Sequence, residues 1–111
     1  MTIQEQIKQY MSDNGISYES AADDMGWSKQ NLWDKLNNRV SPNFDTMMTI
    51  LDGLKARLVI TDLTMGIHIS DETIQKLLIA AANEKVSYDC VAKLLEALGF
   101  ETEIQFEEVI V

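Results

Sequence analysis

The residues with the clearest chemistry lie in the stretch SKQNLWDKLNNR, which runs from Ser28 to Arg39. Lys29, Gln30 and Asn31 form the first turn of a predicted helix that begins after the capping residue Ser28. Glutamine and asparagine side chains can bind adenine through two hydrogen bonds, and a lysine can reach guanine or a phosphate. This turn could therefore read base edges in the major groove of double-stranded DNA.

The same stretch carries residues placed to contact the phosphate backbone. Ser28 and the helix amino termini can hold phosphates through backbone N–H groups, and further candidates are Lys35, Asn37, Asn38 and Arg39. Between positions 27 and 41, Lys29, Lys35 and Arg39 are opposed only by Asp34. The segment that would meet DNA is therefore weakly basic.

Three predicted helices position this stretch. Thr2 and Glu5 form a capping box for a helix over residues 3–13, and Ser17 caps a short helix over residues 18–25. Gly26 permits the turn into the third helix, over residues 29–37, in which Leu32 fills the angle between the second and third helices. The four-residue step from Met25 through Ser28 fits a helix-turn-helix, whose second helix enters the groove.

The remainder is predicted to mix helices with short strands. Ser41-Pro42 opens a fourth helix, and residues 56–61 and 65–69 are β-prone runs that fit a hairpin with an open register. Ser70 caps a helix over residues 71–84, Ser87 caps one over residues 88–98 that ends at Gly99, and the tail alternates as a paired strand would. We expect a mainly α fold with a small β-sheet. An N-terminal helix-turn-helix bundle (residues 1–62) is followed by a helix-helix-strand half (residues 63–111) for dimerisation or partner binding.

A partial internal repeat is present. VSPNFDTMMTILDGLKARLVI and VSYDCVAKLLEALGFETEI both run from a serine cap through an aspartate and an apolar helix into a strand. The two segments match at Asp45 and Asp89 and at Leu51 and Leu95, if two residues are skipped after the first serine. The similarity is compatible either with coincidence or with a duplicated helix-plus-strand unit whose two strands share one sheet.

Residues 1–62 resemble the Cro and phage-repressor helix-turn-helix family, also called XRE-type regulators. ESAADDMG looks like the second helix of that family, SKQNLWDKLNN resembles the recognition helix of its small phage-like members, and FDTMMTILDGLKARLVI is similar to the helix and strand that follow. Two departures are Lys55, where glycine is usual, and Trp33, where a small polar residue is common.

The resemblance implies a sequence-specific transcriptional regulator of phage or mobile-element type that binds operator DNA as a homodimer. It also implies that Lys29, Gln30 and Asn31 hold the base-reading positions, and that Tyr18 and Ser28 contact phosphates. Residues 63–111 match no family that we can name, and they are left as a possible site for a protein partner.

The charge favours an alternative. The chain of 111 residues has a formal net charge of -9, and residues 63–111 hold three basic residues against nine acidic ones. An acidic surface could occupy a nucleic-acid channel on a larger enzyme, and phage anti-CRISPR proteins with an amino-terminal helix-turn-helix combine such an activity with repression of their own promoter. Alternatively, the second half could neutralise a toxin as an antitoxin does. The alternative interpretation of the three helices is a fold that is used for protein contact.

Other features of the sequence argue against an enzyme. There is no phosphate-cradling glycine loop, nucleophile elbow or metal-ligand spacing, so we expect no catalysis, cofactor or metal site. His68 stands alone, Cys90 is expected to be a buried thiol, and Trp27 and Trp33 are interpreted as packing residues. No apolar run is long enough to cross a bilayer and no signal peptide is recognisable, so we expect a cytoplasmic protein that does not enter membranes.

Overall fold

A computed structural model describes residues 2–62 and 71–106. In this part of the chain the helices are α1 (Ile3–Asp13), α2 (Tyr18–Met25), α3 (Lys29–Asn37), α4 (Phe44–Gly53), α5 (Asp71–Asn83) and α6 (Tyr88–Ala97), and the strands are β1 (Ala56–Asp62) and β2 (Phe100–Phe106). The fold is mainly α with a small two-stranded antiparallel sheet, which confirms the predicted fold class. The first three helices have the predicted bounds.

The N-terminal helices assemble around α3. Each of the first three helices begins at a side chain that accepts a backbone N–H, namely Thr2, Ser17 and Ser28. Leu32 is fully buried between α2 and α3, as predicted, and Leu36 lies one turn further along the same face. These side chains join one core cluster that continues through α4 into the second half of the chain.

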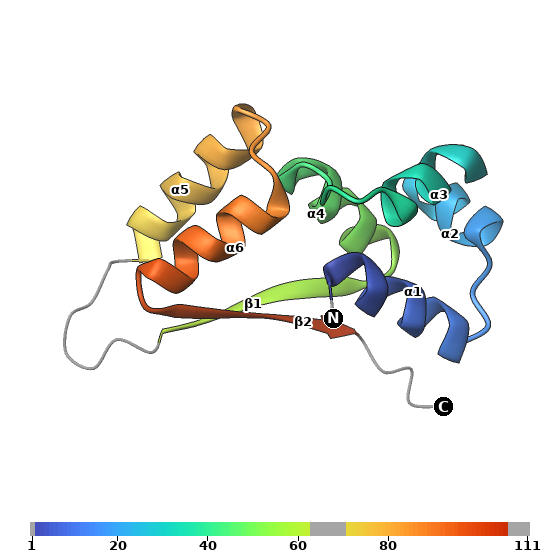
Figure 1. Cartoon of the computed structure of the whole chain (residues 1–111), viewed down its shortest axis with the longest axis horizontal. Coiled ribbons are helices and arrows are strands. Elements are labelled where there is room, and N and C mark those ends of the chain that lie inside the picture. Colours follow the sequence, from blue (N-terminus) through green and yellow to red (C-terminus); the bar gives the residue numbers. More distant parts are fainter. Residues whose placement is uncertain (1, 63–70, 107–111) are drawn as a thin grey trace.

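The sheet joins the two halves of the chain. β1 and β2 pair antiparallel over seven residues each, from Ala56 opposite Phe106 to Asp62 opposite Phe100. Helices α4 and α6 lie over the same face of this ribbon (Figure 1). At the end of the ribbon where β1 begins and β2 ends, Phe106 stacks on Tyr10 of α1, with ring centroids 4.0 Å apart and planes 13° from parallel.

This pairing settles part of the predicted strand arrangement. Phe100–Phe106 is the paired strand expected in the tail, and the two predicted helix-plus-strand units are present with their strands in one sheet. The described partner of β1 is β2, since the second strand of the predicted hairpin, residues 65–69, lies outside the described residues. The Ser70 cap, His68 and residues 107–111 also lie outside them.

Where the two units meet, their helices begin side by side. Asn43 and Ser87 form an antiparallel bridge, and Phe44 and Tyr88 stack with centroids 6.4 Å apart and planes 5° from parallel. Burial raises the pKa of the Tyr88 hydroxyl above 10.0, a hydrogen bond with Thr102 lowers it, and the charge of Asp89 raises it further.

Three expectations about single residues, namely Ser41, Cys90 and Trp33, are wrong. Ser41 does not cap α4, which begins at Phe44; its buried hydroxyl instead accepts the Asp89 N–H of α6 at 3.1 Å. Cys90 is exposed because the buried stripe of α6 runs through Val91 and Leu95, to one side of it.

Trp33, interpreted as a packing residue, is 47% exposed because the buried stripe of α3 runs through Leu32 and Leu36. Trp27 is half-buried against the core, as that interpretation expected. The helix stop at Lys55 is made without glycine, since this residue adopts a left-handed φ of 57°.

Within residues 2–62 and 71–106, no helix is both long and apolar enough to cross a membrane.

Candidate nucleic-acid interface

The turn between α2 and α3 fixes the direction in which α3 starts. Gly26 ends α2 with a left-handed φ of 74°, and its N–H bonds back to the Ala22 and Asp23 carbonyls. Ser28 then caps α3 by accepting the Asn31 N–H at 3.1 Å. Because the turn is closed by hydrogen bonds on both sides, the first turn of α3 starts from a defined position.

The first turn of α3 faces solvent. Lys29 and Gln30 are exposed, and Asn31 is half-buried. α3 packs on α1 and α2, at the end of the molecule opposite α5 (Figure 1). The structure therefore presents two of the three predicted base-reading side chains outward and places the third at the edge of the exposed face.

The exposed face of α3 also holds Trp33 and Asp34, which sequence reasoning did not assign to it. Its exposed residues are Lys29, Gln30, Trp33, Asp34 and Asn37. Asp34 accepts a hydrogen bond from the Gln30 amide at 2.8 Å. If Gln30 is to bind an adenine through both its amide nitrogen and its oxygen, it must release this bond.

Some of the predicted backbone-contact residues use their side chains in hydrogen bonds within the protein, and others are exposed beyond the end of α3. Asn37 links three helices, because its amide nitrogen lies 3.4 Å from the Tyr18 hydroxyl and its oxygen accepts from Lys8 at 3.1 Å. Lys35 is half-buried, whereas Asn38 and Arg39 are exposed beyond the end of α3. Ser28, also exposed, uses its hydroxyl oxygen as the helix cap.

Lys8 is a site residue that the sequence reasoning missed. Its ammonium group reaches Asn37 from α1 and adds a cation beside the C-terminal end of α3. The positive charges on this side of the molecule therefore come from α1 as well as from α3. No local pattern marks Lys8, since 29 positions separate it from its partner.

Gln4 is a second missed residue, and it positions the end of α3. It is 5% exposed, and its amide nitrogen donates to the carbonyls of Asn38 at 3.0 Å and Val40 at 3.1 Å, with that of Lys35 at 3.5 Å. These carbonyls would otherwise lack helical partners. A signal was available in the sequence, because Gln4 is a polar residue within the buried stripe of Ile3, Ile7 and Met11.

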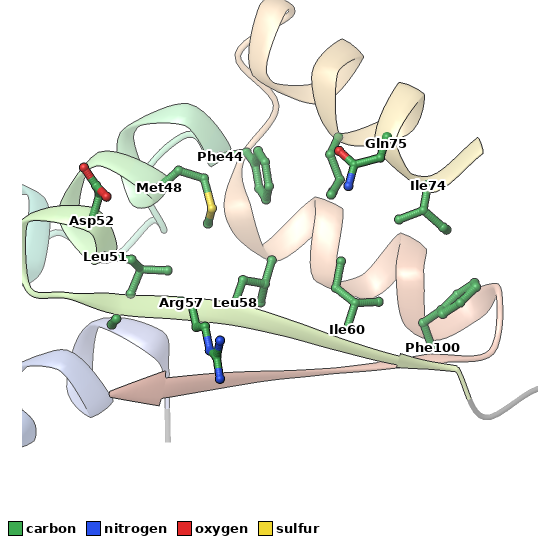
Figure 2. Close-up of a pocket in the computed structure, with 12 residues that line it drawn as sticks. Phe44, Met48, Leu51, Asp52, Arg57, Leu58, Ile60, Ile74, Gln75 and Phe100 are labelled. Atoms are coloured by element: carbon green, nitrogen blue, oxygen red, sulfur yellow. The ribbon is translucent and has the colours of Figure 1, made fainter. Parts of the chain in front are cut away.

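A groove lies in another part of the molecule, between α4, α5 and β1. It has a volume of about 620 Å³ and is lined mainly by apolar side chains, such as Phe44, Leu58 and Ile74 (Figure 2). Asp52 and Arg57 are the charged residues in its lining. None of the predicted site residues contributes to it.

Metal-binding groups were also sought in the described part of the chain. Residues 2–62 and 71–106 contain no group of three or more histidine, cysteine or acidic side chains that could hold a metal ion.

Comparisons of the chain with family models, with curated proteins and with solved structures give no match.

Proposed function

We propose that this chain is a sequence-specific, DNA-binding transcriptional regulator of the Cro and phage-repressor type, with α3 as the helix that enters the major groove. The observation that carries the proposal is the first turn of α3, where Lys29 and Gln30 are exposed on a helix fixed by a capped turn. A side chain that reads bases must be exposed, and it must be held by a rigid support. The first turn of α3 has both properties.

The surroundings of α3 support backbone contact. Lys8, Lys35 and Arg39 come from α1, α3 and the loop after α3, so these cations lie near the C-terminal end of α3, at the opposite end from the reading turn. Phosphate contacts of this kind supply affinity that does not depend on sequence. The acidic second half costs little if it points away, because charges are screened over about 8 Å at physiological salt.

The test is a gel shift with DNA from upstream of the gene, backed by selection from random duplexes. Replacing both Gln30 and Asn31 with alanine should abolish sequence preference, because one bidentate base contact gives about 1–3 kcal/mol of discrimination. Lys35→Ala should weaken binding to all sequences alike and reduce the salt slope by about one. Lys93→Ala is the matched control, since it removes the same charge from an exposed position on α6.

Two results would contradict the proposal: no shift with any duplex at low salt, or a shift that the Gln30 and Asn31 double variant leaves equally strong and equally selective. The second result would mean that the base-reading turn lies elsewhere.

The second candidate is an acidic inhibitor or antitoxin that binds a protein through the second half of the chain. Exposed apolar side chains in that half favour it: Ile79 on α5 is 59% exposed, and Leu94 on α6 is 45% exposed. Exposed apolar side chains of this size are available for contact with a partner protein. If the chain is an inhibitor or antitoxin, charged substitutions at Ile79 and Leu94 should abolish inhibition of the enzyme or neutralisation of the toxin. If the chain is a DNA-binding regulator, the same substitutions should leave the gel shift unchanged.

A further inference from the structure

The helix-plus-strand unit occurs twice, with equivalent positions 44 residues apart. Phe44 and Tyr88 each begin a helix, and Leu51 and Leu95 are each buried at about 1% exposure or less. The shared geometry extends past the helices, because each ends before a residue with a left-handed φ, 57° at Lys55 and 91° at Gly99. A lysine and a glycine both have a left-handed φ there, so the correspondence is structural as well as sequential.

The contacts between the two units are themselves symmetric. The Phe44 N–H donates to the Val86 carbonyl at 2.7 Å, and the Tyr88 N–H donates to the Pro42 carbonyl at 2.8 Å. Exchanging each residue with its equivalent 44 positions away turns the first hydrogen bond into the second. A twofold relation between the units has this property.

The sheet obeys the same relation. Val59 pairs with Glu103, which is its own equivalent 44 positions away, and the other pairs of the ladder are arranged symmetrically about these two residues. Two identical subunits that met through a twofold axis would form this antiparallel ladder. The chain therefore contains, within itself, the interface of an isologous dimer of helix-plus-strand units.

An isologous surface is self-complementary, so one partner saturates it. In this chain the partner for that surface is internal, because β2 pairs with one edge of β1 over all seven residues of the strand. The reading helix is not duplicated in the described residues: the α2–α3 pair precedes α4, whereas α5 alone precedes α6.

From these observations we infer that the chain binds DNA as a monomer, through one α3, and that its target is a single asymmetric site read in one major groove. This inference rests on the proposed function and replaces the homodimer that the family resemblance implies. The second helix-plus-strand unit takes the place of a second subunit in supporting the sheet, and it brings no second reading helix.

The inference makes two quantitative predictions. If one reading helix contacts two or three phosphates, the slope of log affinity against log salt is about -2 to -3, half of that for a symmetric dimer. Sequences selected from random duplexes should contain one short block without an inverted repeat, because paired half-sites mirror a twofold protein.

A cross-link tests whether the internal interface is closed. Val59→Cys and Glu103→Cys, in a Cys90→Ser background that removes the exposed thiol, place two thiols directly opposite each other on β1 and β2. We expect oxidation, or a short thiol-reactive cross-linker, to yield a species of about 12.6 kDa, the mass of one chain. This locked monomer should shift selected DNA as a one-to-one complex with unchanged affinity.

Covalent dimers as the main product, a palindromic selected site occupied by two chains, or loss of DNA binding on locking would each overturn the inference. The Val59→Cys single variant is the control for cross-links between chains. If no variant or wild-type protein shifted any DNA, the proposed function would fall and the single-site part of the inference with it. The mass of the cross-linked product would still decide whether the internal interface is closed.

Discussion

Replacing Gln4 with methionine tests how the reading helix is held in place. The substitution keeps an unbranched side chain of similar length but removes the amide that donates to the Asn38 and Val40 carbonyls at 3.0 and 3.1 Å. Each intramolecular hydrogen bond contributes about 0.5–1.5 kcal/mol net, so two give about 1–3 kcal/mol. The third contact, to Lys35 at 3.5 Å, is too long to add much.

The measurement is urea unfolding followed by tryptophan fluorescence, with the midpoint converted through a common m value. The matched control is Gln9→Met, because Gln9 lies on the same helix but is exposed, and its side-chain amide donates to Asp13, one turn away. We expect this control to change the free energy of unfolding by less than about 0.5 kcal/mol.

A glutamate at the same position sharpens the test. Gln4→Glu offers the carbonyls an ionised carboxylate with no donor, so it should destabilise the protein more than methionine does at neutral pH. Its pKa in the folded state should lie above the ordinary 4.3 of glutamate. The free energy of unfolding should then recover relative to wild type as the pH falls through that raised pKa, where the protonated carboxyl regains a donor.

Equal stability of Gln4→Met and Gln9→Met would refute this reasoning. It would show that water replaces the lost donor at no cost and that Gln4 does not hold the end of α3. If the reasoning holds, Gln4→Met should also weaken DNA binding, although Gln4 is buried and would not contact the DNA.

Three further predictions concern the backbone and one tyrosine. Gly53→Ala should lower the free energy of unfolding by about 1–3 kcal/mol, because the added Cβ would lie 2.5 Å from the Met25 Cγ, and Met25→Ala should recover part of this in a double-mutant cycle by urea unfolding. Lys55→Gly should raise the thermal midpoint, because glycine removes about 1–2 kcal/mol of left-handed strain at φ 57°, whereas Gly99→Ala at φ 91° should lower it. Burial raises the pKa of the Tyr88 hydroxyl, so the unfolded chain loses the hydroxyl proton before the folded chain does as the pH rises past about 10. The free energy of unfolding, measured by urea unfolding, should therefore fall above this pH, and it should fall less in Tyr88→Phe.

Local signals in the sequence were sufficient for most helix bounds. The Thr2, Ser17, Ser28 and Ser87 caps all accept N–H groups at the positions their spacing predicted. Ser41 shows the limit of such signals, because its hydroxyl serves α6, 48 positions away. A cap is a local interaction only while no other part of the chain competes for it.

The candidate site was predictable in part for the same reason. The exposure of Lys29 and Gln30 follows from the helical period and the Ser28 cap, both of which act within a few residues. The same period leaves Trp33 outside the buried stripe of α3, yet its size and apolarity argued for packing. Its 47% exposure depends on which neighbouring helices reach it, and α1 and α2 pack elsewhere on α3.

The sequence by itself determined the helices, their order and the turn that faces outward, because caps, glycine turns and apolar spacing all act over one or two helical turns. The tertiary structure alone decided that β1 pairs with β2, that Gln4 and Lys8 reach the end of α3, and that the two helix-plus-strand units meet through a symmetric pattern of contacts. Those contacts join residues from 29 to 50 positions apart. Their partners are chosen by how the folded elements pack, and no short window of sequence contains both members of such a pair.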